Sequence, residues 1–289
     1  MEKLIDRKLF VRRKLRALAG SPADFLLAHA VAELADRLSL VERRFARAVT
    51  LFDGSAAAAS MLRRTGKVQQ VTRIEAHARL LGGDEGIVEP EEAVPLPPGS
   101  VQLVTSLLHL HAVNDLPGLL LQVLRALAPD GLFIGAFAGA GTLQELRQSL
   151  LAAEAAHSSG AAARIYPFAD VRSAGQLLQR AGFALPVADQ ETLTVRYDSM
   201  FSLLRDLRAM GETSALAGRP RRPLSRAVLA AAADHYARNF AGEDGRIAAT
   251  FNIIWVSAWA PHASQQQPLR PGSAKISLAD VLGRPPGTR

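Results

Sequence analysis

The sequence predicts an α/β protein built on a mostly parallel sheet, and the stretch 101–147 carries this prediction. Residues 101–108 and 132–137 are apolar runs of strand length. Between them, Asn114 or Asp115 begins a segment whose leucines recur at helical spacing. A strand, a helical crossover and a second strand give parallel strands with helices on the sheet faces. Ligands of such sheets lie beyond the carboxyl ends of the strands, which places residues 107–114 at a ligand site.

The segments before and after this stretch extend the pattern. We expect two helices first, the second with Pro22 at its first helical position. Thr142 and Glu145 have the spacing of a capping box. The expected strands lie at residues 48–52, 68–74, 87–88 and 250–260, with a hairpin at 183–187 and 192–197. The expected later helices lie at residues 143–156, 170–181, 199–210 and 225–240.

These elements predict three parts of the chain. Residues 1–45 form an N-terminal helical segment, and residues 46–260 form the α/β domain with a helical insertion at about 199–245. A tail rich in Gln, Pro, Gly and Ser covers residues 261–289.

Composition limits the possible chemistry and location. The 289 residues include no cysteine, which excludes disulfides, thiolate catalysis and zinc held by cysteine. No apolar run approaches the roughly 20 residues that span a bilayer. The charged N-terminus lacks the apolar segment of a secretory signal, so we expect a cytoplasmic location in a bacterium.

The net charge of +7 comes from 34 Lys and Arg against 27 Asp and Glu, and much of the excess lies in the first 16 residues. Those basic residues form either a solvated helix face or a contact for an acidic protein partner or a phosphate. Nucleic acid is not expected as a partner, because no aromatic residue beyond Phe10 interleaves with the charges.

Other site chemistries find little support. The sequence contains neither a G-x-S-x-G elbow nor a phosphate-binding G-x-x-x-x-G-K-[ST] loop. His109, His111 and Asp115 invite comparison with a two-histidine, one-carboxylate iron site. Asp115 is better used as a helix cap, so we expect no metal site.

Several longer motifs resemble one protein family over about residues 5–282. They are VNDLPG at 113–118, PDGLFIGA at 129–136, GTLQELR at 141–147, RAGFALPVAD at 180–189, DLRAMGE at 206–212 and WAPHASQQQPLRPGSA at 259–274. Together they resemble the complex I assembly factor 5 family and its bacterial relatives. That family is similar to class I S-adenosylmethionine-dependent methyltransferases, and its next of kin is the malonyl-carrier-protein methyltransferase of biotin synthesis.

The resemblance implies a Rossmann-like class I methyltransferase fold with a seven-stranded, mostly parallel sheet. It also implies a protein partner and a role in maturing respiratory complex I. The mitochondrial member is described as hydroxylating an arginine of a complex I iron–sulfur subunit.

The resemblance further implies S-adenosylmethionine as cofactor, but the first cofactor motif is degraded. In the usual D-x-G-x-G-x-G pattern, glycine lets the backbone approach the ligand closely. Here Thr50 takes the acidic position, Phe52 and Ala56 take glycine positions, and only Gly54 survives. A bulky Phe therefore stands where the backbone should approach the cofactor.

The remaining cofactor positions follow from the same comparison. Glu75 fits the acid that accepts hydrogen bonds from the ribose. The same position in the sequence is equally typical of a solvated Glu at the end of a strand. Glu89 or Glu91 substitutes for the adenine-contacting Asp, whose place Pro90 takes. The switch loop contributes Leu107 and His111.

Candidates for the substrate cleft are Asn114, Arg205, Arg208 and Glu212, although Arg208 and Glu212 also have the spacing of a helix-surface ion pair. No catalytic residue can be named, since methyl transfer needs positioning more than acid–base chemistry. Three functions stay open: a methyltransferase-family protein acting on a protein, a non-catalytic assembly chaperone, or a small-molecule or carrier-protein O-methyltransferase.

Overall fold

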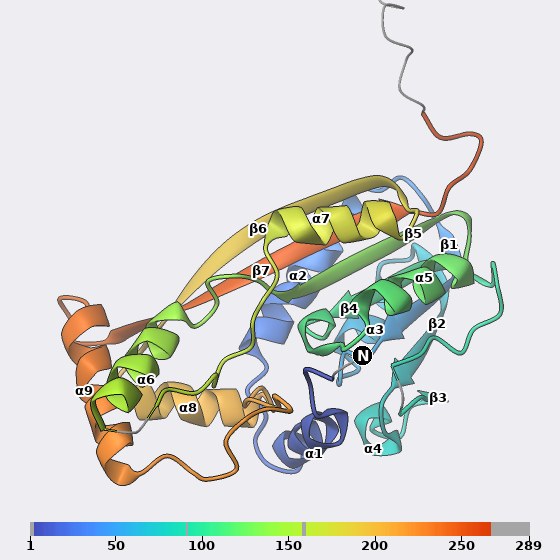
Figure 1. Ribbon diagram of the computed structural model, residues 1–289. Coiled ribbons are helices and arrows are strands. Elements are labelled where there is room, and N and C mark those ends of the chain that lie inside the picture. The colour runs from blue at the N-terminus through green and yellow to red at the C-terminus, as the bar shows by residue number, and fades with distance from the viewer. Residues whose placement is uncertain (1–2, 91, 158–159, 267–289) are drawn as a thin grey trace, which may run out of the picture.

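The computed structural model describes residues 3–90, 92–157 and 160–266. Its centre is a seven-stranded sheet in the order β3-β2-β1-β4-β5-β7-β6 (Figure 1). The strands are β1 (Phe45–Leu51), β2 (Val68–Glu75), β3 (Gly86–Val88), β4 (Val101–Leu107), β5 (Leu127–Ala138), β6 (Ala184–Tyr197) and β7 (Ile247–Trp259). Strands β1 to β5 pair in parallel, whereas β7 pairs antiparallel with both β5 and β6. The mostly parallel α/β sheet predicted from the sequence is confirmed.

The helices are placed between successive strands and before β1. They are α1 (Arg7–Leu18), α2 (Phe25–Ser39), α3 (Ala57–Arg64), α4 (Ala78–Leu81), α5 (Leu116–Ala126), α6 (Gln144–His157), α7 (Val171–Arg180), α8 (Met200–Ala209) and α9 (Arg226–Phe240), with a short 3-10 helix at Leu110–Ala112. No helix within the described part of the chain is long and apolar enough to cross a membrane.

Two apolar layers cover the two faces of the sheet. Helices α5 and α7 pack on one face, and α2 and α3 pack on the other. The alternation of a strand explains both layers, because neighbouring residues point to opposite faces. In β4, for example, Leu103 packs toward α2 and α3, while Val104 packs toward α5 and α7.

Helices α6, α8 and α9 form a third apolar cluster at one end of β6 and β7 (Figure 1). Leu203 of α8, Tyr236 of α9 and Phe251 of β7 lie in its interior. Because α8 and α9 fall between β6 and β7 in the chain, they stand where the sequence predicts a helical insertion. The division into domains stays a prediction.

Three local predictions are wrong. The expected hairpin at 183–197 is the single strand β6, whose antiparallel partner is β7. Helix α2 begins at Phe25 after Asp24, so Pro22 lies before it. Thr142 and Glu145 form no capping box, since Thr142 Oγ1 bonds the backbone of Asn252 and the Glu145 carboxylate accepts from the N–H and hydroxyl of Thr250.

Candidate functional site

The site begins with the way the N-terminal segment is docked over the sheet. Ile5 forms an antiparallel bridge with Leu216, and its N–H donates to Asn114 Oδ1 at 2.8 Å. Asp6 accepts a hydrogen bond from the Arg219 guanidinium at 3.3 Å. These contacts join the start of the chain to the loop after α8. They hold α1 beyond the carboxyl ends of β1 and β4, where the strand order reverses and ligands of such sheets bind.

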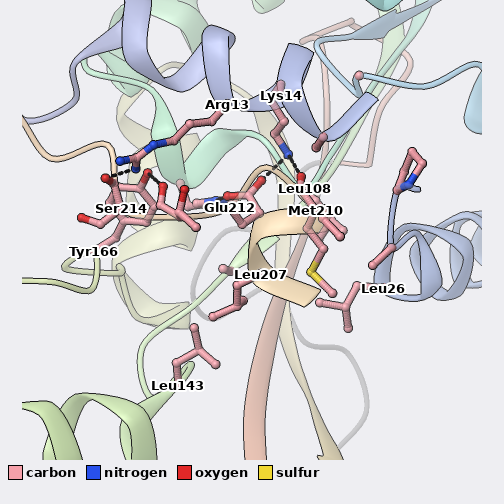
Figure 2. Close-up of a pocket in the computed structure, with 18 of the residues that line it drawn as sticks. Arg13, Lys14, Leu26, Leu108, Leu143, Tyr166, Leu207, Met210, Glu212 and Ser214 are labelled. Atoms are coloured by element: carbon pink, nitrogen blue, oxygen red, sulfur yellow. Dashed lines mark hydrogen bonds and ion pairs between the residues drawn. The ribbon is translucent and has the colours of Figure 1, made fainter. Parts of the chain in front are cut away.

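Lys14 of α1 packs closely against the backbone of the loop after α8. Gly211 adopts a φ of 73°, and a Cβ there would lie 2.9 Å from Lys14 Cα, so only glycine allows this contact. Lys14 Nζ donates to the Glu212 carboxylate and to the Met210 carbonyl (Figure 2). Glu212 also contacts His111 Nε2 at 3.3 Å. Burial alone would raise the pKa of Glu212, but Lys14 and His111 outweigh it and lower that pKa to about 2.

Around Phe52, the space between α1 and the end of β1 is almost completely filled. Phe52 is buried at 4% exposure with a φ of 59°, the left-handed region that favours glycine. Its ring lies 5.0 Å from the His109 ring and 5.2 Å below the Arg7 guanidinium. Phe10 packs edge-on against His109 at 5.6 Å. The hollow that these side chains and their neighbours leave measures only about 10 Å³.

Glu75, at the end of β2, lies in a buried ion pair below this hollow. Its carboxylate accepts the Arg73 guanidinium at 3.0 Å, and both side chains are 1% exposed. The same carboxylate accepts the N–H of Gly54 at 3.1 and 3.2 Å. Burial raises the pKa of Glu75 to about 7, although Arg73 opposes this.

Replacing Glu75 by glutamine is expected to flatten the pH dependence of stability. The native carboxyl holds its proton more tightly than the unfolded one, whose pKa is 4.5. Its contribution to stability is therefore fully present below pH 4.5 and is lost as the pH rises through about 7, a loss of about 3 kcal/mol. Urea unfolding of Glu75→Gln and of the exposed control Glu42→Gln, measured from pH 4 to 8, checks this. Parallel pH profiles for wild type and Glu75→Gln would contradict it.

The closed hollow at Phe52 leaves no room for S-adenosylmethionine in the arrangement that the structure shows. The positive φ values of Phe52 and Gly54 retain the backbone of a glycine loop. The Phe52 ring, however, occupies the approach that glycine would leave open. The Gly54 N–H already donates to both oxygens of the Glu75 carboxylate, which also accepts from Arg73.

A second and far larger cavity, of about 870 Å³, opens beside this closed hollow. Asp53, His111, Glu212 and Ser214 line its polar end, part of which Figure 2 shows. Three atoms of this end are buried without a hydrogen-bond partner among the described residues: Asp53 Oδ2, His111 Nδ1 and Ser214 Oγ. The other oxygen of Asp53 accepts the Leu107 N–H at 2.7 Å. Burial raises the pKa of Asp53 well above its usual range.

The predicted cofactor residues divide between the two spaces. Gly54 and His111 line the large cavity, whereas Phe52, Gly54 and Glu75 surround the closed hollow. Thr50, Leu107 and Glu89 line neither space. Thr50 and Leu107 are buried in the sheet, and Glu89 follows β3, where its N–H donates to the Glu75 carbonyl at 2.8 Å. A cofactor role for these residues stays a prediction.

Three of the four substrate-cleft candidates lie elsewhere. Arg205 and Arg208 are exposed on α8 and do not line the cavity, because the apolar face of that helix points inward instead. The Asn114 side chain accepts from the Ile5 N–H and donates to the Ile5 carbonyl, and its backbone N–H donates to the Glu92 carboxylate. Glu212 does line the cavity, and its ionic partner is Lys14 and not Arg208.

Sequence reasoning missed Asp53 and the covering role of α1. Asp53 is the only acidic residue of the loop at 50–56, directly after an apolar strand, and that signal could have found it. Nothing local could have placed Arg7 and Phe10 over Phe52, because the contact depends on docking to residues 215–219. Across residues 3–90, 92–157 and 160–266, no group of three or more His, Asp or Glu side chains could hold a metal ion.

The fold and the crevice beyond β1 and β4 define a protein of the methyltransferase-domain class, and residues 30–135 match the family described as "Methyltransferase domain". The chain belongs to the family of the arginine-hydroxylase NDUFAF5. It is 38% identical to the rat protein over 290 residues, covering 96% of this chain and 83% of that one. The human protein is 36% identical over 300 residues, covering 99% and 86%. For the zebrafish protein, the 41% identical stretch of 195 residues covers 68% of this chain and 60% of that one.

More distant relatives and solved structures agree with the class. A malonyl-[acyl-carrier protein] O-methyltransferase of Halorhodospira halophila is 32% identical over 292 residues and covers 97% of both chains. The crystal structure of YcgJ from Bacillus subtilis superposes with a TM-score of 0.53 at 14% identity, covering 81% of this chain and 99% of that one. At this identity the structural match supports the fold alone.

Proposed function

We propose that this chain acts on an arginine-bearing segment of a protein partner during the assembly of respiratory complex I. Two observations support the proposal. The family members that it resembles over nearly its whole length are named arginine-hydroxylases. The observation that carries the proposal is the buried carboxyl of Asp53, a residue that lines an 870 Å³ cavity and has one oxygen without a hydrogen-bond partner among the described residues.

Asp53 suits a guanidinium for electrostatic reasons. A planar guanidinium donates two parallel hydrogen bonds to one carboxylate, which makes Arg–carboxylate pairs both strong and directional. Burial keeps the pKa of Asp53 high, although the Leu107 N–H and the Arg73 guanidinium oppose this. An incoming guanidinium would favour the ionised form, so binding would release a proton from Asp53 and strengthen as the pH rises. Glu212 adds a second negative charge to this end, although Lys14 already neutralises it.

The proposal covers both holding the partner and modifying it. The closed hollow at Phe52 favours an activity without S-adenosylmethionine. A chain that only holds the segment would be an assembly chaperone on a methyltransferase scaffold. The unpartnered Asp53 oxygen would bind the arginine in either role. The presence or absence of a chemical change on the bound arginine distinguishes a modifying enzyme from an assembly chaperone.

Replacing Asp53 by asparagine is expected to abolish the function while keeping the fold, because the amide oxygen can still accept the Leu107 N–H. Losing one partner of a buried charge pair costs about 2–5 kcal/mol of binding, which is at least about 30-fold in affinity. Cells lacking the gene would be complemented with wild type, Asp53→Asn or the exposed control Asp36→Asn. Mass spectrometry of the complex I subunits would then follow the mass of each arginine.

An arginine carrying one added oxygen is expected with wild type and Asp36→Asn, and is expected to be absent with Asp53→Asn and in the deletion strain. Complex I that fails to assemble in the deletion strain, with no oxidised arginine in wild type, would favour the chaperone role. Normal assembly and unchanged arginine masses in the deletion strain would sink the proposal.

A second candidate is O-methylation of a carrier protein, favoured by the relative that matches 97% of this chain. It requires S-adenosylmethionine at the Phe52 hollow. Purified protein incubated with malonyl-carrier protein and radiolabelled S-adenosylmethionine would test it directly, and absence of labelled ester would remove this candidate.

A further inference from the structure

The part of the large cavity away from Asp53 is walled by leucine side chains. Leu146 and Leu150 line it from the first half of α6, Leu143 lines it from the residue before α6, and Leu204 and Leu207 line it from α8. The α6 and α8 pairs have the four- and three-residue spacing of one helix face. The α6 pair spans about 6 Å along the helix axis. In Figure 2, Leu143 and Leu207 lie apart from the polar group formed by Arg13, Lys14 and Glu212.

Arg221 and Arg222 stand at the edge of this leucine-lined half. They lie in the loop between α8 and α9, they are exposed, and they line the cavity. Two other arginines of the lining have acidic partners, since Arg164 pairs with Glu154 and Arg219 with Asp6. Within the described residues, no carboxylate pairs with Arg221 or Arg222. The cavity therefore joins leucine side chains to two exposed cations that have no carboxylate partner in the described part of the chain.

The walls indicate the shape of the occupant. A volume of 870 Å³ lies within the range of about 300–1,000 Å³ typical of small-molecule sites. An α-helix of a partner, about 10–12 Å wide and three turns long, would exceed that volume. The leucine side chains suit a flexible hydrocarbon chain, which gains affinity with each methylene removed from water. The aromatic rings of Tyr166, Phe168 and Phe251 add to the apolar lining of the cavity.

We propose that the leucine-lined half of the cavity binds a single-chain anionic amphiphile, a long-chain fatty acyl carboxylate. Its chain lies along α6 and α8, and its carboxylate pairs with Arg221 and Arg222. Arginine is the side chain best matched to a carboxylate at such an entrance, because its fork donates two hydrogen bonds to the two oxygens. The inference does not depend on arginine recognition at Asp53, which belongs to the other end of the cavity.

The test is a displacement titration on the full-length protein with dansyl-labelled undecanoate as the fluorescent probe. Octanoate, dodecanoate and dodecylamine are the competitors, each used below its micelle concentration. Dodecanoate is expected to bind on the order of 100-fold more tightly than octanoate, because each buried methylene contributes about fourfold. Dodecylamine has the same chain with a positive head group, and it is expected to bind at least about tenfold more weakly than dodecanoate.

Two variants locate the site. Arg221→Glu/Arg222→Glu is expected to weaken dodecanoate at least about tenfold and dodecylamine hardly at all. Its matched control is Arg63→Glu/Arg64→Glu at the exposed end of α3, which changes the net charge equally. Leu204→Trp fills the cavity and is expected to weaken both competitors, whereas Leu151→Trp, on an exposed position of α6, is not. Asp53→Asn is expected to leave dodecanoate binding unchanged, which separates this inference from the proposed function.

Three results would overturn the inference. One is a failure of dodecanoate to displace the probe at its solubility limit. Another is equal binding of dodecanoate and dodecylamine, which would leave no role for Arg221 and Arg222. The third is equal loss of binding in the two double-arginine variants, which would place the effect in the overall charge of the protein.

Discussion

The Phe52→Gly variant is expected to bind S-adenosylmethionine with a Kd of about 100 μM, roughly −5.5 kcal/mol, where wild type gives no saturable heat up to about 1 mM. The variant removes the ring that lies between Arg7 and His109 and restores the residue that the left-handed φ of 59° favours. The backbone at Gly54 would then be approachable from the hollow. Isothermal titration calorimetry of both proteins measures the difference.

The same substitution carries a cost in stability that must be measured beside it. Deleting a buried phenylalanine side chain typically costs about 3–5 kcal/mol, of which glycine at a left-handed position recovers about 1–2 kcal/mol. Urea unfolding at the temperature of the titration measures the free energy of unfolding of the variant and checks that it is folded there. Phe201→Gly, which removes a half-exposed ring from α8, serves as the control and is expected to bind no cofactor. Tight binding of S-adenosylmethionine by wild type would contradict the prediction and would show that α1 moves away from the hollow readily.

Replacing Arg73 by methionine is expected to lower the free energy of unfolding by about 3–5 kcal/mol. The guanidinium is 1% exposed and donates to Glu75, Asp84 and the carbonyls of Leu80 and Leu81 at 2.7–3.0 Å. Without it, a buried carboxyl and two buried carbonyls lose their donor, and each unsatisfied group costs about 1–3 kcal/mol. Urea denaturation near neutral pH measures the loss.

Arg63→Met on the surface of α3 is the matched control, and it is expected to change stability by less than about 0.5 kcal/mol. The double variant Arg73→Met/Glu75→Leu is expected to recover part of the loss, since removing both charges avoids leaving one buried alone. A loss below about 1 kcal/mol for Arg73→Met would mean that water reaches this pair and that Glu75 is less buried than its 1% exposure indicates.

The sheet could be predicted because its information is local. Apolar runs of strand length, such as residues 101–108, alternate with helical periodicity, and the parallel order follows from that alternation. The false hairpin at 183–197 arose because Pro186 and the polar run around Gln190 look like a turn. The structure accommodates both in one strand, with a register shift between Ala184 and Val187 on pairing with β7. Pairing with the long strand β7 therefore outweighs the local turn preference of these residues.

The site was predictable only in part, for a related reason. The loss of glycines at Thr50–Ala56 was visible in the sequence and drew attention to Phe52. The sequence could not predict that Arg7 and Phe10 cover Phe52. Those contacts depend on the docking of α1 against residues more than 200 positions later in the chain. Arg208 and Glu212 had helix-pair spacing, yet Gly211 ends the helix between them and turns Glu212 toward Lys14.

The docking of the N-terminal segment also constrains when the site forms during synthesis. Asp6 pairs with Arg219, which lies 213 positions further along the chain. On the ribosome, α1 is made first, but its contacts with the loop after α8 cannot form until that loop has emerged. Closing so long a loop carries a high entropy cost until the sheet has brought the two segments together. The closed hollow at Phe52 and the large cavity are therefore completed late, after most of the sheet and its covering helices have folded.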